Sequence, residues 1–288
     1  MENNNTNINN LEQNIGLKRN NKNNFDKFYT KSTIVDICID NIKRYIEIDN
    51  DDIIIEPSAG NGSFINSIKE LCKNYIFIDI APEHNDILKE DFLEYDFDRI
   101  NKKYNNIHII GNPPFGRQSS TTIKFLKKCK NCNSISFILP KSFKKNSMKK
   151  YFPIYFHLIL SIDLPNNSFI VNNEEHDVPC VFQIWERKDV IREMPKKKNP
   201  INYKFVKKEE DPDISFRRVG VYAGKIDKET EKSEQSHYFV KFNKKLGGLD
   251  DIIDKLNNIC FETDNTVGPK SISKQEIIKE FNDKLNNK

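Results

Sequence analysis

The sequence predicts an α/β protein built on one mostly parallel sheet. Short, almost wholly apolar runs, the pattern of strands buried on both faces, alternate with amphipathic segments at helical spacing. A glycine-containing loop follows the first of these runs, at the end of the strand where open α/β sheets bind ligands. The chain has 288 residues, 37% of them hydrophobic, which is enough for one full-sized α/β domain and a small appendage.

Composition divides the chain into four parts. Residues 1–24 contain 11 asparagines and almost no apolar pattern, so we expect a disordered tail. Residues 25–187 hold the alternating strands and helices of the main domain. Charged residues and prolines over 188–200 predict a linker, and residues 201–288 are expected to form a small C-terminal α+β appendage.

Hydrophobic periodicity places the elements of the main domain. An amphipathic helix is expected over 33–45, and a second helix begins near Ser63, after the strand at 53–55 and the glycine loop. The remaining elements expected here are strands over 75–79, 136–139 and 156–162, a helix over 121–129, and a last, antiparallel strand over 179–185.

The C-terminal part combines short strands with two helices. Strands are expected over 201–206, 214–219 and 238–242, and helices over 249–258 and 273–285. Ser273 and Glu276 form the sequence signature of a capping box at the start of the last helix. Six basic residues in this part could hold phosphates: Arg217, Arg218, Lys225, Lys241, Lys244 and Lys245.

The most informative motif is Asn112-Pro113-Pro114-Phe115, which follows an apolar run and a glycine. The side-chain oxygen of Asn112 can accept a hydrogen bond from an amino group. Consecutive prolines fix the backbone and aim the Pro113 carbonyl as a second acceptor, and Phe115 offers a flat face to a heteroaromatic ring. The motif predicts a site that holds the exocyclic amine of a planar ring; an ordinary turn after a strand is the alternative.

An ordered series of residues at strand ends predicts a nucleoside-like ligand. Gly60 and Gly62 permit close backbone approach, but their spacing is not G-x-G-x-x-G and the loop lacks a phosphate-binding lysine. Asp79 ends the next strand, where an acid suits the two hydroxyls of a ribose. Asp91 lies past the following turn, where a carboxylate could accept from an adenine amine. Each acid alone would more often be a solvated strand end, but their order favours a ligand site.

Together these segments resemble the motif series of S-adenosylmethionine-dependent adenine-specific DNA methyltransferases. The matching segments are 26–30, 56–62, Asp79, 91–92 and 112–115, in the order of the gamma group, and the resemblance covers roughly residues 25–187. It implies a Rossmann-like methyltransferase sheet, mostly parallel with one antiparallel strand, and a C-terminal appendage that recognises the substrate. Lys31 stands where many relatives have proline, and position 115 holds Phe instead of the commoner Tyr.

The resemblance also implies the cofactor, S-adenosylmethionine, and the residues around it. Residues 29–30 would contact its methionine part, and Glu56 with the following loop would surround its amino acid and sulfonium. Asp79 would bind the ribose, and Asp91 with Phe92 would hold the adenine. The implied cofactor site comprises Tyr29, Thr30, Glu56, Pro57, Ser58, Ala59, Gly60, Asn61, Gly62, Asp79, Ile80, Asp91, Phe92 and Asn112.

The implied reaction is direct, in-line methyl transfer to the exocyclic amine of an adenine flipped out of DNA. Its catalytic residues would be Asn112, Pro113, Pro114 and Phe115. Methylation of an RNA adenine, methylation of a glutamine amide in a protein, and an inactive nucleic-acid-binding module are the alternatives. Phe169 is expected either near the target base or in the core.

The charge distribution favours a polyanionic substrate. The chain has a net charge of +4, yet residues 99–162 contain no Asp or Glu, against nine lysines between 124 and 150 and four further basic residues. Lys141, Lys144 and Lys145 of this block are expected to bind substrate phosphates. A solvated helix face is the usual alternative for such a lysine run.

Other features limit the class of protein. The sequence has no signal peptide and no apolar stretch long enough to cross a membrane, so we expect a soluble, intracellular protein. The five histidines lack ligand spacing, so no metal is predicted. Six scattered cysteines suit a reducing compartment, and Cys129 and Cys132 are expected to be plain thiols, with a zinc or redox site as the alternative. The oligomeric state does not follow from the sequence.

Overall fold

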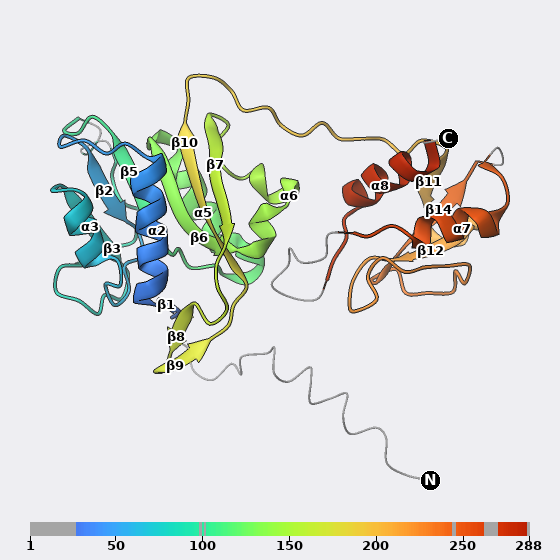
Figure 1. Cartoon of the computed structure of the whole chain (residues 1–288), viewed down its shortest axis with the longest axis horizontal. Helices are drawn as coiled ribbons and strands as arrows, with labels where there is room; N and C mark the ends of the chain where they lie inside the picture. The colour runs from blue at the N-terminus through green and yellow to red at the C-terminus, as the bar shows by residue number, and fades with distance from the viewer. Residues whose placement is uncertain (1–26, 98–99, 101, 244–245, 262–269, 287–288) are drawn as a thin grey trace, which may run out of the picture.

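The computed structural model describes residues 27–97, 100, 102–243, 246–261 and 270–286. The predicted tail at 1–24 and the basic residues Lys244 and Lys245 lie outside these described residues. The structure has two units, one built on a seven-stranded sheet and the other on a four-stranded sheet (Figure 1). None of the helices described is long and apolar enough to cross a lipid bilayer.

The large sheet has the strand order β4-β3-β2-β5-β6-β10-β7. From β2 the chain moves outward to β4 and then returns to the other side of β2 with β5, so a topological switch point lies between β2 and β5. Neighbouring strands are parallel except at β10, which is antiparallel to both β6 and β7. This confirms the predicted Rossmann-like sheet with one antiparallel strand. The strands are β2 (Ile53–Glu56), β3 (Tyr75–Asp79), β4 (Leu88–Lys89), β5 (Ile107–Gly111), β6 (Ser134–Pro140), β7 (Phe156–Asp163) and β10 (Cys180–Arg187).

Helices pack on both faces of this sheet because its central strands are apolar on both sides. In β5, Ile110 belongs to the core formed with α2 and α3, whereas Ile109 belongs to the core that contains Phe125 of α5. The helices predicted over 33–45 and 121–129 are confirmed, and the helix expected near Ser63 begins at Ile65. The helices of this unit are α2 (Ser32–Tyr45), α3 (Ile65–Leu71), α5 (Ser120–Lys128) and the short α6 (Asn146–Lys149).

A small three-stranded sheet, which the sequence did not predict, holds the segment before α2 in place. It consists of β1 (Tyr29–Thr30), β8 (Phe169–Val171) and β9 (Glu174–His176), in the order β1-β8-β9 (Figure 1). Strands β8 and β9 form a hairpin between β7 and β10, and β1 pairs antiparallel with β8. The chain just before α2 is therefore fixed by a hairpin that lies far from it in the sequence.

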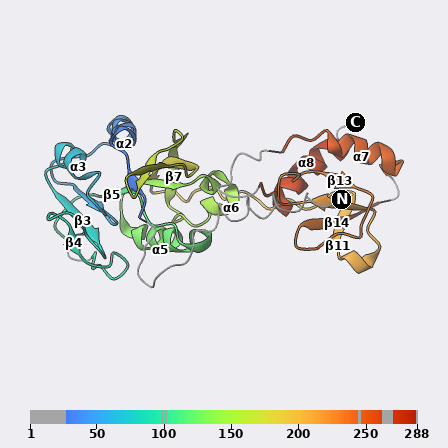
Figure 2. The same cartoon turned by 90° about the horizontal axis from the view of Figure 1, so that it is seen from below.

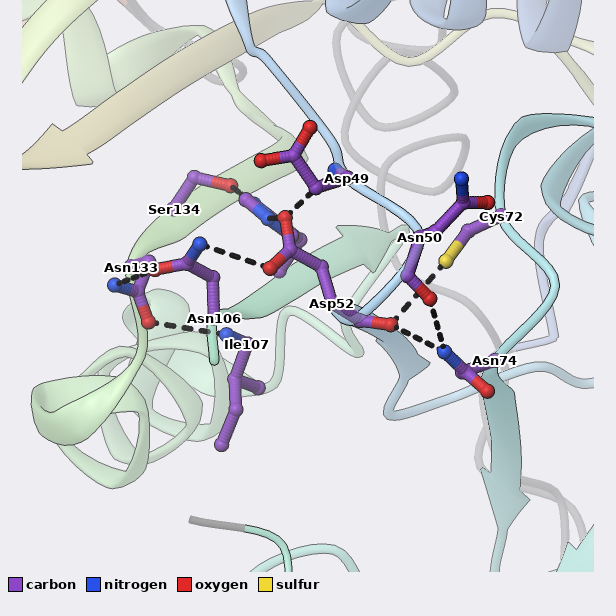
Figure 3. Close-up of polar contacts among 10 residues, drawn as sticks. Asp49, Asn50, Asp52, Cys72, Asn74, Asn106, Ile107, Asn133 and Ser134 are labelled. Carbon is purple, nitrogen blue, oxygen red and sulfur yellow. Dashed lines mark hydrogen bonds and ion pairs between the residues drawn. The ribbon is translucent and has the colours of Figure 1, made fainter. Parts of the chain in front are cut away.

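At the amino-terminal edge of the large sheet, a buried polar network joins the segments that lead into β2, β5 and β6 (Figure 3). The Asp52 carboxylate accepts hydrogen bonds from the backbone N–H of Asp49 and from Nδ2 of Asn106, both at 2.8 Å. It also lies 3.3 Å from Nε2 of His108, whose Nδ1 lies 2.8 Å from Oγ of Ser134. Burial opposes ionisation of Asp52, but these hydrogen bonds outweigh it and hold the pKa below its usual value.

The carboxyl-terminal unit is an antiparallel sheet packed with two helices (Figures 1 and 2). Its own core includes Phe216 and Phe281. The predicted capping box is confirmed, because the backbone N–H of Ser273 donates to the Glu276 carboxylate and that of Glu276 donates to the Ser273 hydroxyl. The elements are β11 (Tyr203–Val206), β12 (Ile214–Arg217), β13 (Ile226–Asp227) and β14 (His237–Phe242), in the order β11-β14-β12-β13, with α7 (Leu249–Asn257) and α8 (Lys274–Asn286).

Two basic side chains form contacts where the chain passes between the two units. Arg192, within the predicted linker at 188–200, donates a hydrogen bond to the carbonyl of Lys149 at 3.0 Å and lies over the ring of Trp185 at 5.0 Å. Lys145, immediately before α6, donates to the carbonyl of Ser271 in the other unit at 2.8 Å. In both views α6 is the helix of the first unit nearest to the second unit (Figures 1 and 2).

Candidate active site

A cavity of about 550 Å³ lies at the carboxyl edge of the large sheet, beside the switch point between β2 and β5. The structure brings all four predicted catalytic residues, Asn112, Pro113, Pro114 and Phe115, into its wall. All of the predicted cofactor residues also line the cavity, with the exception of Gly62. The segments that meet here are β1, the loops after β2, β3, β4 and β5, and the first part of α5.

Glycines and one carboxylate shape the loop after β2. Gly60 (φ 54°) and Gly62 (φ 85°) have left-handed backbone conformations, and a Cβ on Gly62 would lie 2.6 Å from Cδ1 of Ile65. The two carboxylate oxygens of Asp79 accept hydrogen bonds from the backbone N–H groups of Gly60 and Ala81, each at 2.8 Å. Asp79 therefore positions two loops of the cavity, and each oxygen retains a lone pair for a ligand hydroxyl.

Glu56, the last residue of β2, is a buried carboxylate with an unsatisfied oxygen. Its side chain is 2% exposed, and within the described part of the chain Oε2 has no hydrogen-bond partner. Burial, with a further contribution from the charge of Asp79, raises the pKa of Glu56 to about 8. A cationic ligand group beside Glu56 would offset the cost of ionising it in the interior. The sulfonium and amino groups of S-adenosylmethionine are cationic, so Glu56 fits the cofactor that the sequence implied.

The amino-terminal segment fixes the orientation of the Asn112 amide. Nδ2 of Asn112 donates to the carbonyl of Phe28 at 3.3 Å and to Oγ1 of Thr30 at 3.4 Å. The Asn112 carbonyl accepts a hydrogen bond from the Ser58 hydroxyl at 3.0 Å. Because Nδ2 faces acceptors of the protein, Oδ1 is left to accept a hydrogen from an amine of the substrate.

Aromatic rings complete the cavity wall. Phe115 is half-buried and packs against the core on the α2 side of the sheet. Phe92 is 1% exposed and lies against Phe125 with the ring centroids 5.1 Å apart, so its position is fixed by packing. Asp91 is exposed, and its carboxylate accepts a hydrogen bond from the backbone N–H of Leu93 at 2.8 Å. This local hydrogen bond fixes the Asp91 side chain at the rim of the cavity.

Glu83 joins β1 to the loop after β3, a contact that the sequence did not indicate. The Tyr29 hydroxyl lies 2.7 and 2.8 Å from the two oxygens of Glu83, and Lys27 forms an ion pair with the same carboxylate. The hydrogen bond from Lys27, followed by that from Tyr29, lowers the pKa of Glu83. Lys27 and Phe28 also line the cavity. Both residues belong to segment 26–30 of the motif series, but the sequence alone indicated no role for them.

The predicted base-contacting residue, Phe169, is not among the lining residues of the cavity. It lies in β8, is 1% exposed, and packs edge-on against Phe28 with the ring centroids 6.1 Å apart. Because Phe28 lines the cavity, Phe169 supports the wall from behind, which agrees with the core alternative.

The three lysines expected to bind phosphates lie outside the cavity wall and next to acids. Nζ of Lys141 is 3.7 Å from the carboxylate of Asp163, and Nζ of Lys144 is 3.1 Å from it. Lys145 lies 3.8 Å from the carboxylate of Glu276. The block that lacks acids in the sequence therefore has acids from β7 and α8 beside it in the fold.

The other predicted cations and thiols also have definite environments. Arg218 donates to the carbonyl of Gln235 at 2.8 Å, and Lys241 pairs with Asp211 at 3.1 Å. The thiols of the C-x-x-C segment at 129–132 are buried and form no disulfide. Across the described residues, no group of three or more His, Cys, Asp and Glu side chains is placed to hold a metal ion.

Comparisons with known proteins find distant structural similarity. No family model and no curated protein sequence matches the chain. A putative class I S-adenosylmethionine-dependent methyltransferase from Listeria monocytogenes is 15% identical with a TM-score of 0.44, covering 65% of this chain and 68% of that one. A putative RNA methyltransferase from Pyrococcus horikoshii is 15% identical with a TM-score of 0.41, covering 59% of this chain and 90% of the other.

A dimethyladenosine transferase from Plasmodium falciparum is 16% identical with a TM-score of 0.39, covering 57% of this chain and 64% of that structure. These similarities concern the overall fold, and both the sequence identities and the TM-scores are low. The strand order and the geometry of the cavity, described above, are the basis of the functional conclusions.

Proposed function

We propose that this chain is an S-adenosylmethionine-dependent methyltransferase that modifies the exocyclic amine of adenine in DNA. The observation that carries the proposal is the convergence of Asn112, Phe115, Glu56 and Asp79 on one cavity from the ends of three neighbouring strands. The first two residues supply what a planar amine requires, and the other two supply what a cationic nucleoside requires.

The cofactor side of the cavity has a partner for each part of that ligand. Glu56 provides a buried carboxylate for a cationic group, and Asp79 provides acceptors for ribose hydroxyls. Asp91 provides an acceptor at the rim for an adenine amine. When bound there, S-adenosylmethionine supplies an electrophilic methyl group.

On the substrate side, the residues orient the amine instead of activating it covalently. Oδ1 of Asn112 and the carbonyl of Pro113 accept the two hydrogens of the amine, while Phe115 stacks on the ring. The amine nitrogen would form the new bond to the methyl carbon as the bond from that carbon to sulfur breaks, with the sulfur keeping the electron pair. The nitrogen would then release one proton to water. Holding the reacting groups in line contributes on the order of 7–11 kcal/mol to lowering the barrier.

The position of α5 supports a polyanionic substrate. Thr121 and Phe125 of this helix line the cavity, while Lys124 and Lys127 of the same helix are exposed. A strand of nucleic acid whose base entered the cavity would pass these lysines, and an adenine flipped from a duplex would present its amine to Asn112.

The test is methyl transfer from labelled S-adenosylmethionine to duplex DNA, single-stranded DNA, RNA and protein in parallel. We expect label in DNA, recovered as N6-methyladenine after digestion. Label in RNA alone would move the proposal to RNA adenine, and label in protein alone would contradict a nucleic-acid substrate. Lack of transfer to all four, by protein that binds the cofactor, would overturn the proposal.

A further inference from the structure

A second cavity, of about 190 Å³, lies on the sheet of the carboxyl-terminal unit. We call it the β12–β14 pocket. Two of its residues, Ser215 and His237, are buried, whereas Lys225 and Tyr222 are exposed, so the pocket leads from the sheet surface to the solvent. Its lining residues are Ser215, Arg217, Tyr222, Lys225, Asp227, Lys232 and His237.

The cations of the pocket are only partly neutralised. Arg217 donates through Nε to the carbonyl of Val219 at 3.2 Å. Neither Arg217 nor Lys225 lies within ion-pair distance of a described acid, although the charge of Lys225 contributes to lowering the pKa of Asp227. Lys232 pairs with Glu229. One acid, Asp227, lines the pocket, and its carboxylate accepts from the backbone N–H of Glu229 at 3.1 Å.

The pKa of the buried histidine responds to burial and to charges of both signs in the pocket. Burial lowers the pKa of His237, and the charges of Arg217 and Lys232 lower it further. A hydrogen bond to the carbonyl of Ser233 and the charge of Asp227 act in the opposite direction. The lowered pKa favours the neutral form of the imidazole. An anion bound between the cations would reduce their effect on His237 and raise its pKa.

A structured loop presents two exposed apolar side chains at the mouth of the pocket. Val221 is 82% exposed and Tyr222 is 69% exposed, the largest values among the large apolar side chains described. The loop lies between Gly220 (φ 98°) and Gly224 (φ 104°), and the backbone N–H of Gly224 donates to the carbonyl of Arg217 at 2.8 Å. The exposed ring of Tyr222 contributes little to packing in the core. Its fixed position beside cations is suited to binding a ligand.

We propose that the β12–β14 pocket binds one backbone phosphate of the substrate nucleic acid between Arg217 and Lys225, and that Tyr222 stacks on the adjacent unpaired base. A phosphate would satisfy Arg217 and Lys225, neither of which forms an ion pair with a described residue, through charge-assisted hydrogen bonds. Stacking on an exposed ring requires a base that is not paired in a duplex. This inference rests on the proposed function, because it assumes a nucleic-acid substrate.

Binding of fluorescent oligonucleotides, measured by anisotropy without cofactor over a range of salt concentrations, tests the site. For a short single strand, the Arg217→Gln/Lys225→Gln variant should reduce the slope of log affinity against log salt by about 0.7, the value for one phosphate contact. The control is Lys204→Gln/Lys255→Gln, which removes two lysines that do not line the pocket and should leave the slope unchanged.

The stacking contact has its own pair of variants. Tyr222→Ala should weaken binding of the single strand by about 5- to 150-fold, while Tyr222→Phe retains parent affinity. An abasic oligonucleotide of the same length should bind the parent and Tyr222→Ala equally. Parent-like affinity and salt slope in both Tyr222→Ala and the double variant, with circular dichroism showing folded protein, would overturn the inference.

Failure of the site and failure of the proposed function give different results. If the parent methylates DNA but the pocket variants bind like the parent, the pocket inference falls alone. If the parent binds single strands through the pocket but transfers no methyl group, the inference stands and the proposed function falls.

Discussion

The two ends of strand β2 each place a carboxylate in the interior, and the two are in opposite states. Asp52, just before the strand, is 1% exposed and belongs to the polar network at the amino-terminal edge of the sheet (Figure 3). Glu56, at the end of the strand, is 2% exposed and has an oxygen without a hydrogen-bond partner among the residues that the structure describes. Both side chains are almost inaccessible to solvent, but the hydrogen-bond donors beside them differ.

The number of donors decides which role each carboxylate can have. Backbone and side-chain donors keep the pKa of Asp52 below its usual value despite burial, whereas burial raises that of Glu56 to about 8. A satisfied buried group contributes to the fold, and an unsatisfied one lowers stability until a ligand binds. At one edge of the sheet the carboxylate is satisfied by the protein, and at the other edge a ligand could satisfy it.

The largest expected effect is on the rate of methyl transfer, and it is tested with one asparagine from each edge of the large sheet. Asn112→Ala removes an acceptor aimed at the substrate amine and should lower single-turnover methyl transfer by about 10²- to 10³-fold with cofactor affinity retained. Asn106→Ala at the opposite edge is the matched control and should methylate at the parent rate below its unfolding temperature. Parent-rate transfer by Asn112→Ala would show that the amine-binding role is wrong.

The next largest expected effect is on cofactor affinity and concerns Asp79. Asp79→Ala removes the acceptor of the Gly60 and Ala81 amides and the expected ribose contact, so S-adenosylmethionine affinity should fall by about 10- to 150-fold, equivalent to about 1.5–3 kcal/mol. Asp86→Ala, an acid of the following loop that pairs with Lys69, should bind the cofactor like the parent. Calorimetry that found unchanged affinity in folded Asp79→Ala would remove this residue from the site.

Stability should respond to pH with opposite signs at the two edges. Burial lowers the pKa of His108 below 6.5, so its unfolded form binds more protons and its contribution, present above pH 6.5, is lost as the pH falls through the folded value. The pKa of Glu56 is raised from 4.5 to about 8, so the folded protein loses stability as the pH rises across that interval.

Urea unfolding from pH 5 to 9 measures both effects. Relative to the parent, Glu56→Gln should gain stability as the pH rises from 5 to 8. Asn106→Ala should lose about 1–3 kcal/mol, because it leaves the Asp52 carboxylate with one donor fewer. A parent and Glu56→Gln with parallel pH profiles would contradict the assigned state of Glu56.

The smallest expected effect concerns Lys141, Lys144 and Lys145. If they contact phosphates on duplex DNA, replacing all three with glutamine should flatten the salt dependence of binding by up to about 0.9 log unit per lost contact. Asp163→Asn, which removes the acid beside two of them, should increase DNA affinity. Lys43→Gln on α2 serves as the control. An unaltered salt slope in the triple variant would show that these lysines do not contact phosphates and interact only with groups of the protein.

Local patterns in the sequence predicted much of the sheet and the cavity wall. The apolar run of β2, its glycine loop and the 112–115 motif are contiguous, so their structures depend mainly on nearby residues, and they meet because parallel strands end at one edge. The antiparallel orientation of β10 follows from the resemblance in the order of the segments and not from a local pattern.

The features that the sequence did not predict depend on contacts between distant residues. The pairing of β1 with β8, the contact of Tyr29 with Glu83, and the acid beside Lys144 have no local pattern. Phe169 illustrates the same point, because an aromatic residue after a strand has the same sequence signal whether it faces a cavity or supports its wall.

Proton release on cofactor binding tests the role of Glu56 most directly. At pH 7 the free protein should carry a mostly protonated Glu56, and a cationic ligand beside it should favour the ionised form. Calorimetric titration with S-adenosylmethionine in two buffers of different ionisation enthalpy counts the protons released. We expect the parent to release up to about one proton more than Glu56→Gln at pH 7, and the difference to disappear at pH 9. Equal proton counts for the two proteins at pH 7, or no binding by the parent, would contradict the assignment of this cavity as the cofactor site.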